Sequence, residues 1–138
     1  MSAVFRHEFR IRYAEVDLQS VVFNSRYLEY ADLIITEYWR DIGLHFLGDS
    51  ALEFHVAKAE VDFVQPIRAD EKIEGRAQTE RIGTSSVTTL IELWGMGEAA
   101  DLRATIRLVH VHVDLESGKS IPVPDNARAA LQPLAETA

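Results

Sequence analysis

The sequence predicts an α+β domain in which one long helix is cradled by a curved antiparallel sheet of about five strands. Five segments alternate apolar and polar residues, as half-buried strands do. One long segment has helical periodicity and is apolar nearly all round, so it must be covered on most sides. The order is strand, long helix, then four strands, so only the sheet is large enough to cover the helix.

The first strand is predicted at residues 5–13, FRHEFRIRY, where apolar and charged residues alternate strictly. The long helix follows within residues 24–43. Asn24 or Ser25 can cap its start, and Gly43 can end it. Its polar residues recur at spacings of three and four and form one narrow solvent stripe: Glu29, Asp32, Thr36 and Arg40.

Four further strands are predicted at residues 55–66, 71–81, 85–95 and 100–114. Pro66 ends the first of them, and glycine-containing turns at 83–85, 95–97 and 117–118 follow the other three. A short helix starting at Asp125 closes the pattern. We therefore expect a single domain over residues 1–138.

Composition limits the classes of function and partner that this chain can have. The net charge of −8 argues against nucleic acid as a partner, and the absence of cysteine excludes disulfides and a Cys nucleophile. No stretch is apolar for long enough to predict a membrane helix. The charged N-terminal residues do not resemble a signal peptide, so we expect a cytoplasmic protein. Eleven of the fourteen cations are Arg, whose planar fork suits phosphate oxygens.

One short motif carries a resemblance to a known family. The spacing D-x3-V-V-[FY]-x3-Y is formed by Asp17, Val21, Val22, Phe23 and Tyr27. It resembles the signature of hotdog-fold acyl-CoA thioesterases of the 4-hydroxybenzoyl-CoA thioesterase-like class. Later segments resemble the same family in order: VDFVQPIRADEKI, RIGTSSVTTLIEL and the stretch from VHVDLESGK to the C-terminal helix. The similarity covers nearly the whole chain.

The resemblance implies a hotdog fold and hydrolysis of an acyl-CoA thioester, with Asp17 as the catalytic carboxylate and the backbone N–H of Asn24 as the oxyanion donor. This chemistry suits a thioester, whose thiolate leaves without strong acid assistance. A carboxylate can activate water or attack directly, and the N–H groups at a helix start can stabilise an oxyanion. The family often has Gly two or three residues after the Asp. This chain has Gln19 and Ser20 there, which leaves the loop backbone and the shape of the acyl pocket open.

Further substrate-binding candidates follow from residue type and position: Val22, Phe23 and Tyr27. The aromatic residues Tyr13, Phe23, Tyr27 and Trp39 hint at an apolar or aromatic acyl pocket, although aromatics on these faces are more often core. The 83–86 turn offers Thr84, Ser85 and Ser86, which either touch the thioester or only form the turn. CoA phosphates could be held by Arg81, Arg26, Arg68 or Arg128, but for each of them an ordinary surface position is the favoured interpretation.

Alternative sites are less favoured. Glu29 and Asp32 could supply a helix carboxylate, but their place on the polar stripe favours a solvated or ion-paired role. His110 and His112 share a strand face and could bind metal with Asp114, but exposed or partner-facing histidines are the favoured reading. We expect no metal and no cofactor.

The resemblance also implies a homodimer or tetramer with the site at the dimer seam. Two other functions remain open: a hotdog dehydratase or hydratase, and a non-catalytic module that binds acyl thioesters. A lyase would need a catalytic His near the acid, and no His lies in the Asp17 loop. The acyl group, and whether its carrier is CoA or a carrier protein, stay open.

Overall fold

The structure, a computed structural model, describes residues 4–45 and 52–132. Its element order confirms the predicted one. The elements are β1 (Phe5–Arg10), a 3-10 turn η1 (Tyr13–Glu15), α1 (Arg26–Asp41), β2 (Phe54–Phe63), β3 (Lys72–Ile82), β4 (Ser86–Met96), β5 (Ala100–His112) and α2 (Asp125–Ala130).

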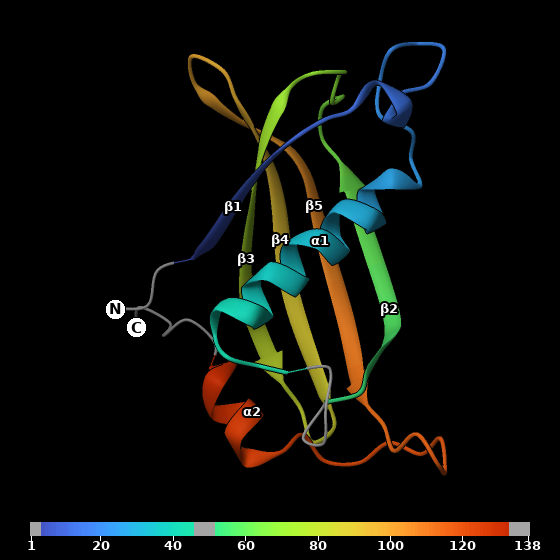
Figure 1. Cartoon of the computed structure of the whole chain (residues 1–138), viewed down its shortest axis with the longest axis vertical. Coiled ribbons are helices and arrows are strands. Elements are labelled where there is room, and N and C mark those ends of the chain that lie inside the picture. Colours follow the sequence, from blue (N-terminus) through green and yellow to red (C-terminus); the bar gives the residue numbers. More distant parts are fainter. Residues whose placement is uncertain (1–3, 46–51, 133–138) are drawn as a thin grey trace.

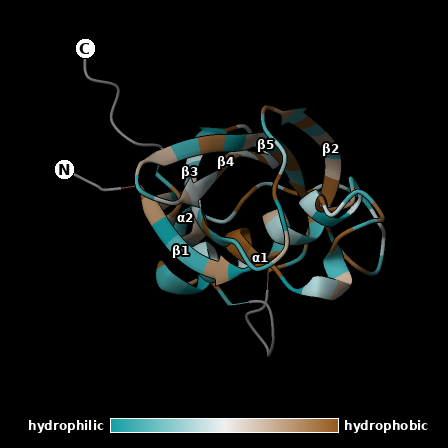
Figure 2. Ribbon diagram, turned by 90° about the horizontal axis from the view of Figure 1, so that it is seen from above, coloured by the Kyte–Doolittle hydropathy of each residue, from teal (hydrophilic) through white to brown (hydrophobic). Residues whose placement is uncertain are grey.

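The five strands form one sheet in the order β1-β3-β4-β5-β2, and every neighbouring pair is antiparallel. Figure 1 shows α1 lying diagonally across one face of this sheet. From above, the strands curve around α1 in an arc from β1 to β2 (Figure 2). The predicted α+β architecture is therefore confirmed.

The core lies between α1 and the concave face of the sheet. Ala31 and Ile34 on the helix are fully buried, and so are Ile73, Ile91 and Ile106 on three neighbouring strands. Gly75 of β3 permits this close approach, because a Cβ there would lie 2.2 Å from Cδ1 of Ile34. A side chain at position 75 would force the side chain of Ile34 to move.

Three local features differ from the sequence expectation. β1 ends at Arg10, and Tyr13 is turned outward into η1 with 74% of its surface exposed. The exposed face of α1 is wider than one polar stripe, because Leu28 and Leu33 are 43% and 37% exposed. In β2, Ala59, Val61 and Phe63 share one face as predicted, opposite Leu108, Ile106 and Ala104, but a bulge between Val56 and Lys58 removes Ala57 from this face, and most of the strand is exposed.

The two histidines of β5 are not exposed, which corrects the favoured sequence reading. The ring of His110 packs edge-on against Trp39 at 4.9 Å, and the ring of His112 lies 5.2 Å from Phe54. Both are buried because alternate residues of this inner strand face α1. Within residues 4–45 and 52–132, no group of three His, Asp or Glu side chains could hold a metal ion. Among the same residues, no helix is long and apolar enough to cross a membrane.

Candidate active site

The candidate site is built on a loop, residues 15–23, that folds back on itself beside the start of α1. Val16 and Val22 form an isolated β-bridge. Two further backbone bonds close the loop: the Asp17 N–H donates to the Val21 carbonyl at 2.9 Å, and the Phe23 N–H donates to the Glu15 carbonyl at 3.1 Å. This hairpin-like closure fixes Asp17 relative to the helix start.

The carboxylate of Asp17 is half-buried and held at one oxygen. Its Oδ1 accepts the backbone N–H of Gln19 at 2.8 Å, the geometry of an Asx turn. Its Oδ2 receives no hydrogen bond from the part of the chain that the structure describes. One oxygen thus anchors the side chain, and the other stays available for chemistry.

Ser20 makes the tight turn of this loop with a φ of +64°. Glycine adopts this left-handed region freely, whereas another L-residue there is strained by roughly 1–2 kcal/mol. Ser20 is one of the two positions at which the family often has glycine. The chain therefore forms, with serine, a backbone turn that glycine favours.

Asn24 lies at the start of α1, where backbone N–H groups have no intrahelical partner. Within the described residues, the Asn24 N–H donates no hydrogen bond. Ser25 occupies the N-cap position without a side-chain cap bond, so neither predicted capping side chain caps the helix. The free N–H lies at the positive end of the helix dipole, where an anion is favoured.

Two separate hollows flank this helix start. The first, about 290 Å³, is lined by Val21, Val22, Asn24, Tyr27 and the 63–66 segment. In it, the buried ring of Tyr27 meets Phe63 edge-on at 4.8 Å. The second, about 450 Å³, is lined by Asp17 and Phe23 together with Ala14, Glu15, Val16, Ser25, Arg26 and Glu29. Within one chain, the two candidate catalytic groups therefore line different hollows.

Glu15 also lines the Asp17 hollow, and the sequence reasoning did not single it out. Its carboxylate is only 6% exposed and accepts the Arg12 backbone N–H at 2.7 Å and the Arg12 guanidinium at 3.2 Å. Burial raises the pKa of Glu15, but the hydrogen bonds and charge of Arg12, with a contribution from Tyr30, lower it by more. The sequence did hold one signal for Glu15: this acid lies three residues after Arg12 and two before Asp17.

The predicted residues of the 83–86 turn lie at the opposite end of the sheet, next to α2 (Figure 1). The Thr84 carbonyl accepts the Val123 N–H at 2.9 Å, and the Ser85 carbonyl accepts the His112 N–H at 2.8 Å. Ser86 and Arg81 flank the same turn. One chain alone does not bring these four residues to Asp17.

Some of the other charged candidates have a partner within the chain, and the rest form no ion pair among the described residues. Arg26 binds Glu29 at 3.0 Å beside the Asp17 hollow, so the ion-paired role expected of Glu29 is confirmed. Arg128 donates to the Gly83 and Thr84 carbonyls. Asp32 is exposed, and among the described residues neither Arg68 nor Arg81 forms an ion pair.

Comparisons with known proteins bear on the family and the fold of the chain. A sequence profile of the thioesterase-like superfamily matches residues 11–131. A 1,4-dihydroxy-2-naphthoyl-CoA hydrolase from Thermosynechococcus vestitus is 21% identical over 131 residues, which cover 93% of this chain and 88% of that protein.

Two solved structures show the fold. A thioesterase from Thermus thermophilus, complexed with coenzyme A and Zn, aligns with a TM-score of 0.80 and 25% identity over 93% of this chain and 90% of that one. An Asp-to-Asn variant of 4-hydroxybenzoyl-CoA thioesterase, complexed with 4-hydroxybenzoyl-CoA, aligns with a TM-score of 0.87 and 12% identity over 95% of this chain and 100% of that one. The helix-in-curved-sheet architecture is thus the predicted hotdog fold.

Proposed function

We propose that this chain, which belongs to the thioesterase-like superfamily, hydrolyses an acyl-CoA thioester to a free acid and CoA. One observation carries the proposal. The 15–23 loop holds a carboxylate with one free oxygen seven residues before a free backbone N–H at a helix start. The CoA thioesters named for the relatives, 1,4-dihydroxy-2-naphthoyl-CoA and 4-hydroxybenzoyl-CoA, support an aromatic acyl group as the first to test.

In this mechanism the free Oδ2 of Asp17 takes a proton from water, whose oxygen attacks the thioester carbonyl carbon. The alternative is direct attack by Asp17, which gives an acyl-enzyme anhydride that water then opens. Either way the carbonyl oxygen becomes an oxyanion, and the Asn24 N–H with the helix dipole stabilises it. The carbon–sulfur bond then breaks, and CoA leaves as the thiolate.

A second copy of the chain would complete the site. The β2 strand is an edge of the sheet, and no described strand pairs with its outer side. Antiparallel pairing of two β2 edges would reverse one chain against the other, so the 83–86 turn of one copy would approach the Asp17 loop of its partner. This supports a homodimer, or a tetramer of two dimers, with Arg81, Thr84, Ser85 and Ser86 acting across the seam.

A panel of acyl-CoAs with a thiol-detecting reagent tests the proposal, with 4-hydroxybenzoyl-CoA, 1,4-dihydroxy-2-naphthoyl-CoA and straight-chain acyl-CoAs as its arms. Release of free CoA supports the thioesterase. Hydration or dehydration of the acyl chain without free thiol would identify a lyase instead. Tight binding without any reaction would identify a binding module. Gel filtration of the same sample measures the assembly state.

A further inference from the structure

We propose that Arg103 is a positioning residue of the site: it holds the 66–71 segment in place, and that segment sets the position of the Asn24 N–H. The catalytic part of this inference rests on the proposed function. The geometric part stands on contacts alone. Arg103 lies in β5, outside every motif that the sequence analysis singled out.

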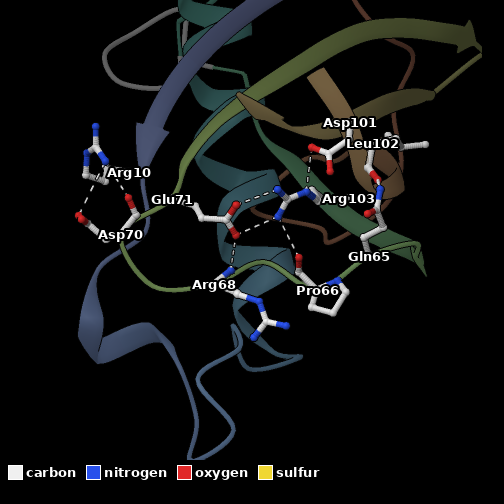
Figure 3. A network of polar contacts seen from close by, with 9 residues as sticks. All are labelled: Arg10, Gln65, Pro66, Arg68, Asp70, Glu71, Asp101, Leu102 and Arg103. Atoms are coloured by element: carbon white, nitrogen blue, oxygen red, sulfur yellow. Dashed lines mark hydrogen bonds and ion pairs between the residues drawn. The ribbon is translucent and has the colours of Figure 1, made fainter. Parts of the chain in front are cut away.

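The Arg103 guanidinium is buried and fully engaged (Figure 3). It forms a two-pronged pair with Glu71, at 2.9 and 2.7 Å, and also binds Asp101 at 3.1 Å. Its Nη1 donates to the Pro66 carbonyl at 2.9 Å. Glu71 in turn accepts the Arg68 backbone N–H at 2.7 Å. One side chain therefore fixes both ends of the 66–71 segment.

This segment is the surface on which the catalytic loop rests. The Ile67 carbonyl accepts the Val22 N–H at 2.7 Å, and Val21 forms a β-bridge with Arg68. Asn24 lies two residues after Val22 and lines the same hollow as Pro66 of this segment, so a shift of the segment displaces its N–H.

Gly95 provides the space for the clamp. A Cβ at this position of β4 would lie 2.4 Å from Nη2 of Arg103 and 2.4 Å from Oδ1 of Asp101. Any side chain there must displace the guanidinium, the Asp101 carboxylate that binds it, or both. The strand thus lacks a side chain at the point where the guanidinium needs room.

The charges favour the same arrangement. The hydrogen bonds from Arg103 are the main cause of the lowered pKa of Glu71, although its partial burial acts in the opposite direction. The pKa of Arg103 is raised, chiefly by Glu71. A guanidinium fork can bind Glu71 and the Pro66 carbonyl at once, whereas a lysine ammonium lacks this planar geometry.

Two variants disturb the clamp in independent ways. Arg103→Lys keeps the charge and loses the fork, while Gly95→Ala keeps all charges and displaces the fork, the Asp101 carboxylate or both by steric contact. The matched controls are Arg107→Lys, on the same strand as Arg103, which alters an exposed ion pair with Glu80 of β3, and Gly97→Ala, which meets open space.

The first measurement is amide hydrogen exchange by NMR, which does not depend on activity. We expect exchange of the Val22 amide to accelerate about tenfold or more in Arg103→Lys and Gly95→Ala, while the amide of Ile106 in the core stays within about twofold of the parent value. The controls should match the parent at both amides.

The second measurement is the split between kcat and KM. We expect kcat to fall about 10- to 100-fold in both clamp variants, because a small misplacement of a catalytic group is costly. KM should change less than about threefold, since the Arg103 carbonyl still accepts the N–H groups of Val64 and Gln65 and keeps that wall of the hollow in place.

The outcomes separate the two proposals. Unchanged exchange at Val22, or acceleration that is equal at Val22 and Ile106, would overturn the positioning role. A parental kcat in both clamp variants would do the same. If the parent chain hydrolyses no acyl-CoA, the proposed function fails, and exchange at Val22 still decides whether Arg103 positions the loop.

Discussion

The two ends of the sheet are built in opposite ways. At the Asp17 end, the loop exposes Leu18 fully and leaves 54% of Phe23 exposed beside a carboxylate oxygen and an N–H without described partners. At the α2 end, Arg128 donates to two carbonyls of the 83–86 turn. There the ring of His112 also bonds the Pro122 carbonyl at 3.1 Å.

The contrast shows where the chain keeps unused binding capacity. Exposed apolar groups beside unpaired polar groups contribute little to folding and are typical of surfaces that bind something. The α2 end uses its polar groups to hold its own turns. Substitutions near Asp17 should therefore change activity more than stability, and substitutions in the buried sheet should do the reverse.

The largest effect is expected for Asp17→Asn. The side chain keeps its size and can still accept the Gln19 N–H, so thermal unfolding should stay close to that of the parent. Loss of the carboxylate should lower kcat by about 10²–10⁴-fold in the thiol-release assay. Asp32→Asn, on the exposed face of α1, is the control and should be unaffected. Near-parental turnover of Asp17→Asn would reject this residue as base or nucleophile.

The second-largest effect on kcat is expected when the backbone N–H of Asn24 is removed. Asn24→Pro removes the N–H, and loss of one oxyanion donor costs about 10²–10³ in kcat. Asn24→Ala keeps the N–H and should keep most of kcat, because the Asn24 side chain is exposed and is not the helix cap. Circular dichroism and gel filtration must first show that the Pro variant is folded and assembled. A well-folded but inactive Asn24→Ala would assign the role to the side-chain amide.

In the buried sheet, His110 should couple stability to pH. Burial lowers its pKa from 6.5 to about 4. Below about pH 6.5 the unfolded chain therefore binds a proton at His110 that the folded chain does not bind. The free energy of unfolding is thus fully maintained above this pH and falls below it, by about 2 kcal/mol at pH 5. Urea unfolding at pH 7.5 and pH 5 measures this difference.

The matched variants for this measurement are His110→Leu and His55→Leu. His110→Leu should lose most of the dependence between pH 7.5 and 5, whereas His55→Leu, at an exposed position, should keep it. Glu15 and Glu71, whose pKa values are lowered, contribute mainly at more acidic pH. A His110→Leu variant with the parental pH dependence would contradict the burial argument.

The smallest effect is expected for Ser20→Gly in the loop. Glycine relieves the strain of the positive φ but gains conformational freedom in the unfolded chain. We expect the free energy of unfolding to rise by only a few tenths of a kcal/mol, measured by urea denaturation, with kcat unchanged. Ser20→Val, a branched residue at φ +64°, should instead lose about 1 kcal/mol.

Periodic features of the fold were predictable from the sequence. The bounds of β3, β4 and β5 were predicted within two residues, because alternation records which face of a strand is buried. α1 was predicted for the same reason with a period of 3.6. β2 was also predicted, but its end was placed three residues too late, and the bulge beside Lys58 left no periodic trace.

The site was predictable only in part. Asp17 and Asn24 were found through a local motif, and their catalytic roles remain predictions. Glu15 was missed although its partner Arg12 lies only three residues earlier. Arg103 was missed because its partner Glu71 lies 32 residues away. The burial of His110 depends on contact with Trp39 from another element. Such pairings are created by the topology and have no signature in a single segment.

The strand order also has a consequence for synthesis on the ribosome. The two edges of the sheet, β1 and β2, come from the first half of the chain, and each pairs with a strand made later: Phe5 with Ala77, and Phe54 with His112. β1 lacks its partner until β3 is translated, β2 lacks its partner until β5 is translated, and until then the apolar face of α1 is only partly covered. The nascent chain must therefore wait for its last strand before the sheet can close around the helix.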